Sequence, residues 1–294
     1  MVKMLQFLRH PTAQVVTVHL LWQFILLALY KILIWVTPHI FSSGPTAFLM
    51  PQILSVVASI AAFRIMLLTS TRCNISFGFT AKSSVTDILV GLLLGALAYM
   101  IYVVISLSGG WYRIIGIDNR YYFRFALLYC FLVAIAEETI FRGYIFQTLE
   151  KHWDTKIALL GSSFLFGLAH VINWSGGGRW HSGHLLDWVV QPIFAGFIGG
   201  ILYSAAFLLT RRMWIPIGLH CAWDTGATIF FNDPYGIASL YKAVVDVNAY
   251  RITGIAYWTV TLFIMAFAAI LLYIAFRRGN WRSKTVSAPV RLEA

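Results

Sequence analysis

Three short runs of the sequence place acidic and imidazole side chains inside segments that are otherwise apolar. In AEETIFRGYIF (residues 136–146), two adjacent glutamates and an arginine interrupt a long apolar run. The runs LLGSSFLFGLAHVIN and WIPIGLHCAWDTGATIFF carry His170 and the pair His220 and Asp224, respectively. An ionised side chain at the middle of a bilayer costs about 2.5–3.5 kcal/mol on insertion scales. Because that cost is seldom tolerated without a purpose, we interpret the three runs as a candidate functional site.

Helical spacing indicates which of these side chains share a face. Glu138 and Arg142 are four residues apart with the acid first, which is the favourable order for an ion pair. Glu137 lies about 100° further around the helix and is therefore the unpaired carboxylate. His220 and Asp224 are also four residues apart, so Asp224 could orient the imidazole, or both side chains could bind one ion.

The chemistry that these groups could perform together is hydrolysis by an activated water molecule. His170 is the one ionisable residue of its apolar run, and Phe166 lies one turn before it on the same face. A carboxylate can take a proton from water, and histidines can share that water or stabilise an oxyanion. Alternatively, two histidines and a carboxylate can bind a divalent metal such as zinc, with one position open for water. The candidate catalytic residues, which are also the candidate metal ligands, are Glu137, His170, His220 and Asp224. The HExxH zinc motif is absent, so the sequence leaves both mechanisms open.

Composition places the chain among membrane proteins. Its 294 residues are 60% hydrophobic and 11% charged, with a mean hydropathy of +0.77, whereas soluble domains carry about 25% charged residues. We therefore predict an all-α polytopic membrane protein, with about eight transmembrane helices in one bundle around an intramembrane polar site. The predicted spans cover residues 15–37, 46–69, 85–108, 124–148, 156–173, 187–209, 214–232 and 254–276.

The basic residues indicate topology rather than nucleic-acid binding. The net charge is +11, but the Lys and Arg residues cluster at the ends of apolar runs, where they would face anionic lipid. Most of the 22 basic residues fall on the inside if the N-terminus does, so we predict that both termini are cytoplasmic. We expect one transmembrane domain over residues 1–277, a disordered basic tail over 278–294, and a location in a prokaryotic cytoplasmic (inner) membrane.

The three polar runs resemble the motifs of a known family. EETIFR (137–142) is similar to its EExxxR motif, FGLAH (166–170) to FxxxH, and HCAWD (220–224) to HxxxN or HxxxD. Over a core of about residues 124–232, the chain resembles the CPBP family of CAAX proteases and bacteriocin-processing enzymes, also called Abi-type membrane proteases. The resemblance implies an eight-helix intramembrane protease fold.

The resemblance also implies roles for the candidate residues. Glu137 and His170 would activate the water, and His220 and Asp224 would support the oxyanion or complete the site. The supporting residues would be Glu138, Arg142 and Phe166. Asp224 stands where the prenyl-protein proteases generally carry Asn, so prenyl-protein processing is left open.

We therefore expect an intramembrane endopeptidase, either glutamate-dependent or metal-dependent. Its partner would be a membrane-anchored peptide or protein that is lipidated, CAAX-like or bacteriocin-like. The alternative is a non-catalytic protein of the same fold that acts in bacteriocin self-immunity or as a scaffold. A proton-coupled transporter is less favoured, because no internal repeat is evident. The sequence does not indicate an oligomeric state.

Two other groupings are weaker candidates. Cys221 neighbours His220, but adjacent residues on a helix diverge by about 100°, which aims a Cys–His pair badly. His181 and His184 lie in the glycine-rich run SGGGRWHSGH with the spacing of a metal clip, but no acid pair accompanies them. We expect that run to be a flexible loop over the site.

Overall fold

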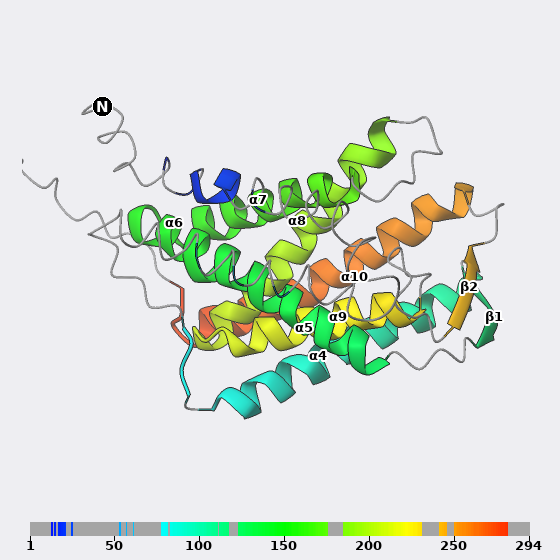
Figure 1. Cartoon of the computed structure of the whole chain (residues 1–294), viewed down its shortest axis with the longest axis horizontal. Helices are drawn as coiled ribbons and strands as arrows, with labels where there is room; N and C mark the ends of the chain where they lie inside the picture. The colour runs from blue at the N-terminus through cyan, green and yellow to red at the C-terminus, as the bar shows by residue number, and fades with distance from the viewer. Residues whose placement is uncertain are drawn as a thin grey trace, which may run out of the picture.

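The computed structural model (Figure 1) describes most of the chain from residue 78 onward. The described residues are 78–81, 83–110, 112–117, 123–175, 185–230, 241–245 and 250–281, with isolated positions between 13 and 61. The predicted spans 15–37 and 46–69 lie outside the described residues, except for those isolated positions. The loop with His181 and His184 and the tail from residue 282 also lie outside them.

The described chain is predominantly helical. Its helices are α4 (Ser84–Ser108), α5 (Phe123–Glu138), the π-helix η1 (Thr139–Phe146), α6 (Gln147–His152), α7 (Thr155–Ser175), α8 (Leu185–Thr210), α9 (Trp214–Phe230) and α10 (Tyr250–Arg277). Each predicted span from residue 85 onward coincides with a helix, and α5, η1 and α6 follow one another without a break. Among the described residues, Ser84–Ser108 and Ile193–Thr210 are long and apolar enough to cross a membrane, and Thr261–Arg277 is a shorter apolar helix. The full set of eight spans stays a prediction.

Two short strands accompany the helices without changing the predicted all-α class. β1 (Tyr112–Ile117) and β2 (Tyr241–Val245) pair antiparallel, with an irregularity between Ile114 and Gly116. Their sequences, YRIIGI and YKAVV, are rich in the β-branched and aromatic residues that favour strands. Because β1 follows α4 and β2 precedes α10, the pairing brings these two connections to one end of the bundle (Figure 1).

A network of ion pairs lies at the opposite end. In the turn between α8 and α9, Arg211 binds Glu150 of α6 through two hydrogen bonds of 2.5 and 2.9 Å. Arg211 also donates to the carbonyl oxygen of Asn280, just beyond α10. Arg212 binds Asp87 in the first turn of α4, at 2.5 and 2.9 Å. The connections that the structure describes thus lie at two ends, the arrangement expected of helices that cross a membrane, while the side that each end faces stays a prediction.

Glycines allow two pairs of helices to approach closely. A Cβ atom added at Gly167 of α7 would lie 2.3 Å from the carbonyl oxygen of Ile193 in α8. A Cβ atom added at Gly91 of α4 would lie 2.3 Å from the carbonyl oxygen of Ile215 in α9. Such backbone contacts between helices are characteristic of packing in membranes, where small residues replace the hydrophobic driving force.

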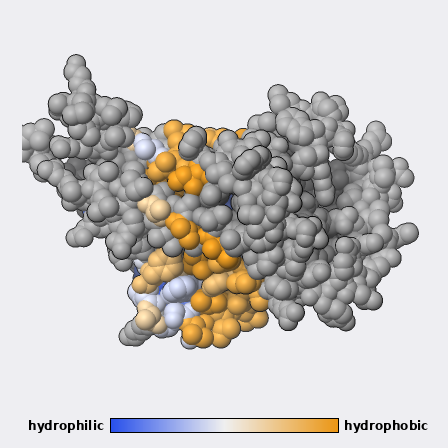
Figure 2. All heavy atoms as spheres, viewed as in Figure 1, coloured by the Kyte–Doolittle hydropathy of each residue, from blue (hydrophilic) through white to orange (hydrophobic). Residues whose placement is uncertain are grey.

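The outward face of the bundle is apolar. In Figure 2, much of the described surface seen from this side is hydrophobic. On α4, the exposed apolar side chains include Val85, Leu89, Leu93, Leu97, Met100 and Val104. A continuous apolar stripe of this kind would be a liability in water but is suited to contact with lipid.

The glycine contacts predict a sharp difference between two Gly→Ala substitutions. Gly167→Ala should lower the free energy of unfolding by about 1–3 kcal/mol, because the methyl group must force α7 away from α8. Gly199→Ala in α8 is the matched control, since its Cβ atom would come no closer than 3.7 Å to any neighbour. It should leave stability unchanged or raise it by about 0.5–1 kcal/mol. Thermal unfolding in detergent micelles measures both, and equal effects of the two substitutions would contradict the close helix contact.

Candidate active site

The helix that carries the acidic motif changes type directly after the two glutamates. The π-helix η1 starts at Thr139, whose hydroxyl donates a 2.6 Å hydrogen bond to the carbonyl oxygen of Ile135. A side chain that occupies this acceptor competes with the regular helical ladder. The sequence predicted an ordinary α-helix here, and the structure corrects that expectation. π-Helical turns occur frequently at functional sites, because they widen a helix locally.

The ion pair expected from the spacing of Glu138 and Arg142 is present and fully buried. Arg142 Nη1 donates to Glu138 Oε1 at 3.0 Å, and both side chains are 0% exposed. Arg142 Nη2 donates to the carbonyl oxygen of Gly200 in α8 at 2.9 Å. The guanidinium also lies over the ring of Phe166 in α7, 4.5 Å from its centroid. Arg142 therefore connects three helices as well as neutralising an acid.

His220 lies among three carboxylates. Its Nδ1 atom is 2.8 Å from Glu138 Oε1. Its Nε2 atom is 3.3 Å from Asp224 Oδ2 and 3.8 Å from Glu137 Oε2. A neutral imidazole has a single N–H, so the imidazolium is the form that can donate on both sides. The sequence suggested that Asp224 could orient His220, but the shorter contact comes from Glu138, on another helix.

Tyr203 of α8 completes the surroundings of His220 and was not predicted from the sequence. Its ring stacks on the imidazole with the centroids 4.3 Å apart and the planes 14° apart. The Arg142 guanidinium lies 5.2 Å from the same ring. Tyr203 is buried within the run ILYSAAFLL, where a tyrosine looks like an ordinary core residue. The one available signal was a phenol hydroxyl within a predicted span.

His170 is held in a defined orientation on α7. Its Nδ1 atom is 2.9 Å from the carbonyl oxygen of Phe166, and the two rings are 4.7 Å apart. A carbonyl oxygen can only accept, so Nδ1 carries the hydrogen and the neutral imidazole keeps its lone pair on Nε2. Gly196 of α8 makes room for this ring, because a Cβ atom there would lie 2.9 Å from Nδ1.

Glu137 is the least satisfied of the three acids. Its side chain is 13% exposed, and its Oε2 atom is buried without a hydrogen bond to any described residue. It interacts electrostatically with His220, His170, Asp224 and Glu138. The other three candidate catalytic residues thus lie near this carboxylate. Asp224, at 34% exposed, is much more accessible than either Glu137 or His220.

The described residues do not support the predicted metal site. No three His, Cys, Asp or Glu side chains among them are arranged as ligands of one metal ion. Both nitrogens of His220 face carboxylates, which suits an imidazolium better than a metal ligand. Cys221, the other alternative, has its Sγ atom 3.8 Å from the carbonyl oxygen of Leu127.

The buried ion pair predicts strong energetic coupling between its two members. Arg142→Met should destabilise the protein by about 3–5 kcal/mol, because it removes a buried partner of Glu138 and leaves this carboxylate with His220 alone. The double variant Glu138→Gln, Arg142→Met should cost about 1–3 kcal/mol less than the sum of the two single variants. Chemical denaturation in detergent micelles measures the cycle, with the exposed Arg278→Gln as a control expected to stay within about 0.5 kcal/mol of the parent. Additive effects would show that the pair contributes no coupling.

Comparison with known proteins gives one family match. Residues 119–226 match the family model described as Rce1-like, type II CAAX prenyl endopeptidase Rce1-like. No match was found among curated proteins or among solved structures. The matched segment spans all three motifs, from Glu137 to Asp224, and the family consists of membrane proteases. Residues 119–226 of this chain are therefore an Rce1-like domain, and the resemblance to the CPBP family that the three motifs predicted is confirmed.

Proposed function

We propose that this protein is an intramembrane endopeptidase that hydrolyses a peptide bond with water activated by Glu137 and His170. The observation that carries the proposal is the Glu137 carboxylate, whose buried Oε2 atom has no hydrogen bond to any described residue and lies 3.8 Å from His220. The Oε2 atom of Glu138 is also without a hydrogen bond, but the Oε1 atom of Glu138 is bonded to both Arg142 and His220. Buried carboxylate oxygens are normally satisfied, and the exceptions call for an explanation. A general base that binds a water molecule on Glu137 Oε2 supplies one.

Each side chain of the site then has a distinct part in the reaction. Glu137 takes a proton from the water while the oxygen of the water attacks the carbonyl carbon of the substrate. His170 Nε2 accepts a hydrogen bond from the same water. His220 Nε2 lies 3.3 Å from Asp224 and 3.8 Å from Glu137, distances longer than that of a strong hydrogen bond. Its N–H group can therefore donate a hydrogen bond to the oxyanion that forms. Glu137 returns the proton to the leaving amine. Glu138 fixes His220 from the other side, and Arg142 holds Glu138.

The substrate class follows from the depth of the site and from the family. We infer a membrane-anchored peptide or protein that is lipidated, CAAX-like or bacteriocin-like and is cut near its membrane end. The location that fits is a prokaryotic cytoplasmic membrane with both termini in the cytoplasm and eight spans, in one domain over residues 1–277. Asp224, at the position where the prenyl-protein proteases generally carry Asn, adds a third carboxylate beside His220.

Mapping of new protein C-termini in membranes tests the proposal. Glu137→Gln and His170→Ala, expressed at the level of the parent, should each lower the cleavage rate about 10²–10⁴-fold, because each removes a group that handles the water proton. Asp154→Asn is a matched carboxylate-to-amide control outside the site. Asp154 Oδ1 accepts a hydrogen bond from the Ile157 amide at the start of α7, and Asn caps helices equally well.

The two outcomes separate an enzyme from a binding protein. Termini that disappear in both site variants and persist in Asp154→Asn would establish proteolysis and identify the substrate. A set of termini that is identical in every variant, with the cellular phenotype retained, would instead favour the non-catalytic immunity or scaffold protein.

Tyr203 provides a second test, because its ring contacts His220 and Arg142 but takes no part in the proposed proton transfers. Tyr203→Phe keeps the stacked ring and should retain cleavage within about threefold, whereas Tyr203→Leu should lower kcat about 10–100-fold, because small displacements of catalytic groups are costly. The loss should fall on kcat rather than KM, because Tyr203 is itself buried and acts by positioning His220. Equal activity of the Leu and Phe variants would show that the stacking does not position His220.

A further inference from the structure

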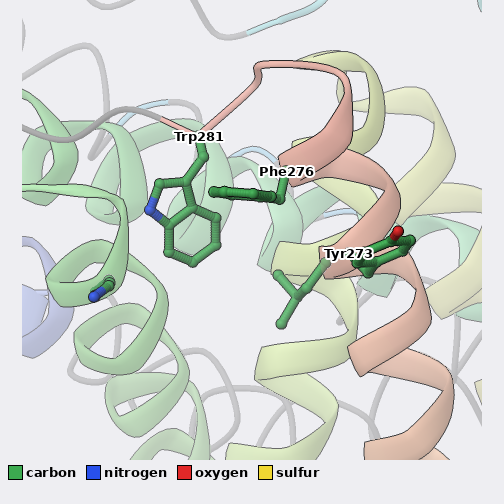
Figure 3. Close-up of a pocket in the computed structure, with 5 residues that line it drawn as sticks. Tyr273, Phe276 and Trp281 are labelled. Atoms are coloured by element: carbon green, nitrogen blue, oxygen red, sulfur yellow. The ribbon is translucent and has the colours of Figure 1, made fainter.

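A hollow lies at the ion-paired end of the bundle, away from the candidate active site. Its volume is about 320 Å³, and it is lined by Lys156, Leu272, Tyr273, Phe276 and Trp281 (Figure 3). The cation comes from the first turn of α7 and the other residues from the end of α10 and the chain just beyond it. A volume near the lower end of ligand pockets suits one chain or one headgroup rather than a whole folded partner.

The wall formed by Trp281 is held in place by the end of α10. Gly279 adopts φ +72°, and the amide of Asn280 bonds back to the carbonyl oxygen of Ala275, so the chain reverses at this point. The Asn280 side chain then donates to the carbonyl oxygens of Leu208 and Leu209 at 2.9 and 3.0 Å. The chain reversal places Trp281 beside Phe276, and Tyr273 lies one turn before Phe276 in α10 (Figure 3).

The hollow continues into an apolar surface. The apolar stretch of α10 runs over Thr261–Arg277 and ends beside Lys156 and Trp281. Its exposed apolar side chains are Leu262, Met265, Ile270, Tyr273, Ile274 and Phe276. An extended apolar chain could lie along this stripe with its polar end at the hollow. Trp and Tyr at such a junction are typical of the boundary between hydrocarbon and headgroups.

The electrostatics of this end favour an anion. Its acids are already engaged: Asp87 with Arg212, Glu150 with Arg211, and Asp154 with the start of α7. In the described part of the chain, by contrast, no carboxylate pairs with the exposed basic residues Lys156, Arg277 and Arg278.

From this combination we propose that the hollow binds one anionic glycerophospholipid. The Lys156 ammonium binds the phosphate, the aromatic rings of Tyr273, Phe276 and Trp281 cover the glycerol region, and an acyl chain follows α10. The charge complementarity and the continuous apolar stripe select this occupant over a soluble anion, which would leave the stripe unused. The site is separate from the proposed catalytic residues and holds a resident lipid rather than a substrate.

Fluorescence quenching in nanodiscs tests the proposal on the full chain. Phosphatidylglycerol with brominated acyl chains, present as a minor component in phosphatidylcholine, should quench Trp281 more strongly than phosphatidylcholine with the same brominated chains. The difference between the parent and Trp281→Phe isolates the signal of this residue. Lys156→Gln should weaken the apparent phosphatidylglycerol affinity about fivefold, the value of one basic side chain near an anionic surface. Lys156→Arg should retain it.

Two control variants make the result decisive. Lys151→Gln removes the same charge at the same end without lining the hollow, and it should leave the quenching unchanged. Removal of residues 282–294 should also leave the lipid preference intact. Equal quenching by the two lipids, an effect of Lys151→Gln as large as that of Lys156→Gln, or loss of the preference on truncation would each overturn the proposal. The last result would assign the preference to the basic tail.

Discussion

A fully buried arginine is the constraint on which the site depends. Arg142 cannot lose its proton in a protein, so its charge must be neutralised where it lies. Glu138 provides the neutralisation, and the same carboxylate oxygen receives His220. The position of His220 then fixes its distances to Glu137 and Asp224. Arg142 thus influences the positions of four ionisable side chains, which are Glu137, Glu138, His220 and Asp224. Its hydrogen bond to the carbonyl oxygen of Gly200 connects this group to α8.

Close helix packing makes this arrangement rigid. The rings of Phe166 and Tyr203 enclose Arg142 and His220 from α7 and α8, and these helices approach closely because Gly167 and Gly200 carry no side chains. The rings replace water as the surroundings of the charges while leaving their hydrogen bonds intact. Catalytic groups held in this way need little reorganisation when charge develops during a reaction.

The sequence predicts most of this arrangement where the relevant interactions are local. Helix positions follow from apolar runs, and the Glu138–Arg142 pair follows from a spacing of four residues. The acid that orients His220 could not be deduced, because Glu138 lies 82 positions earlier in the chain and meets it only through packing. Tyr203 could not be deduced for the same reason, because its contacts with Arg142 and His220 come from other helices. The π-helix η1 depends on a hydroxyl contact at Thr139 that ordinary helical periodicity does not reveal, and the paired strands depend on two connections meeting in space.

The contrast between the two ends of the bundle bears on how the molecule can move. One end is cross-linked by Arg211 and Arg212, which join the α8–α9 turn to α4, to α6 and to the chain after α10. Toward the other end, the described residues show the two-stranded ribbon of β1 and β2 and the ring contact of Tyr99 in α4 with Trp223 in α9, but no ion pair. Segments with few buried contacts open at lower free-energy cost than cross-linked ones. We therefore expect the end that carries Arg211 and Arg212 to act as the hinge of the bundle, about which the helices joined there change their angles.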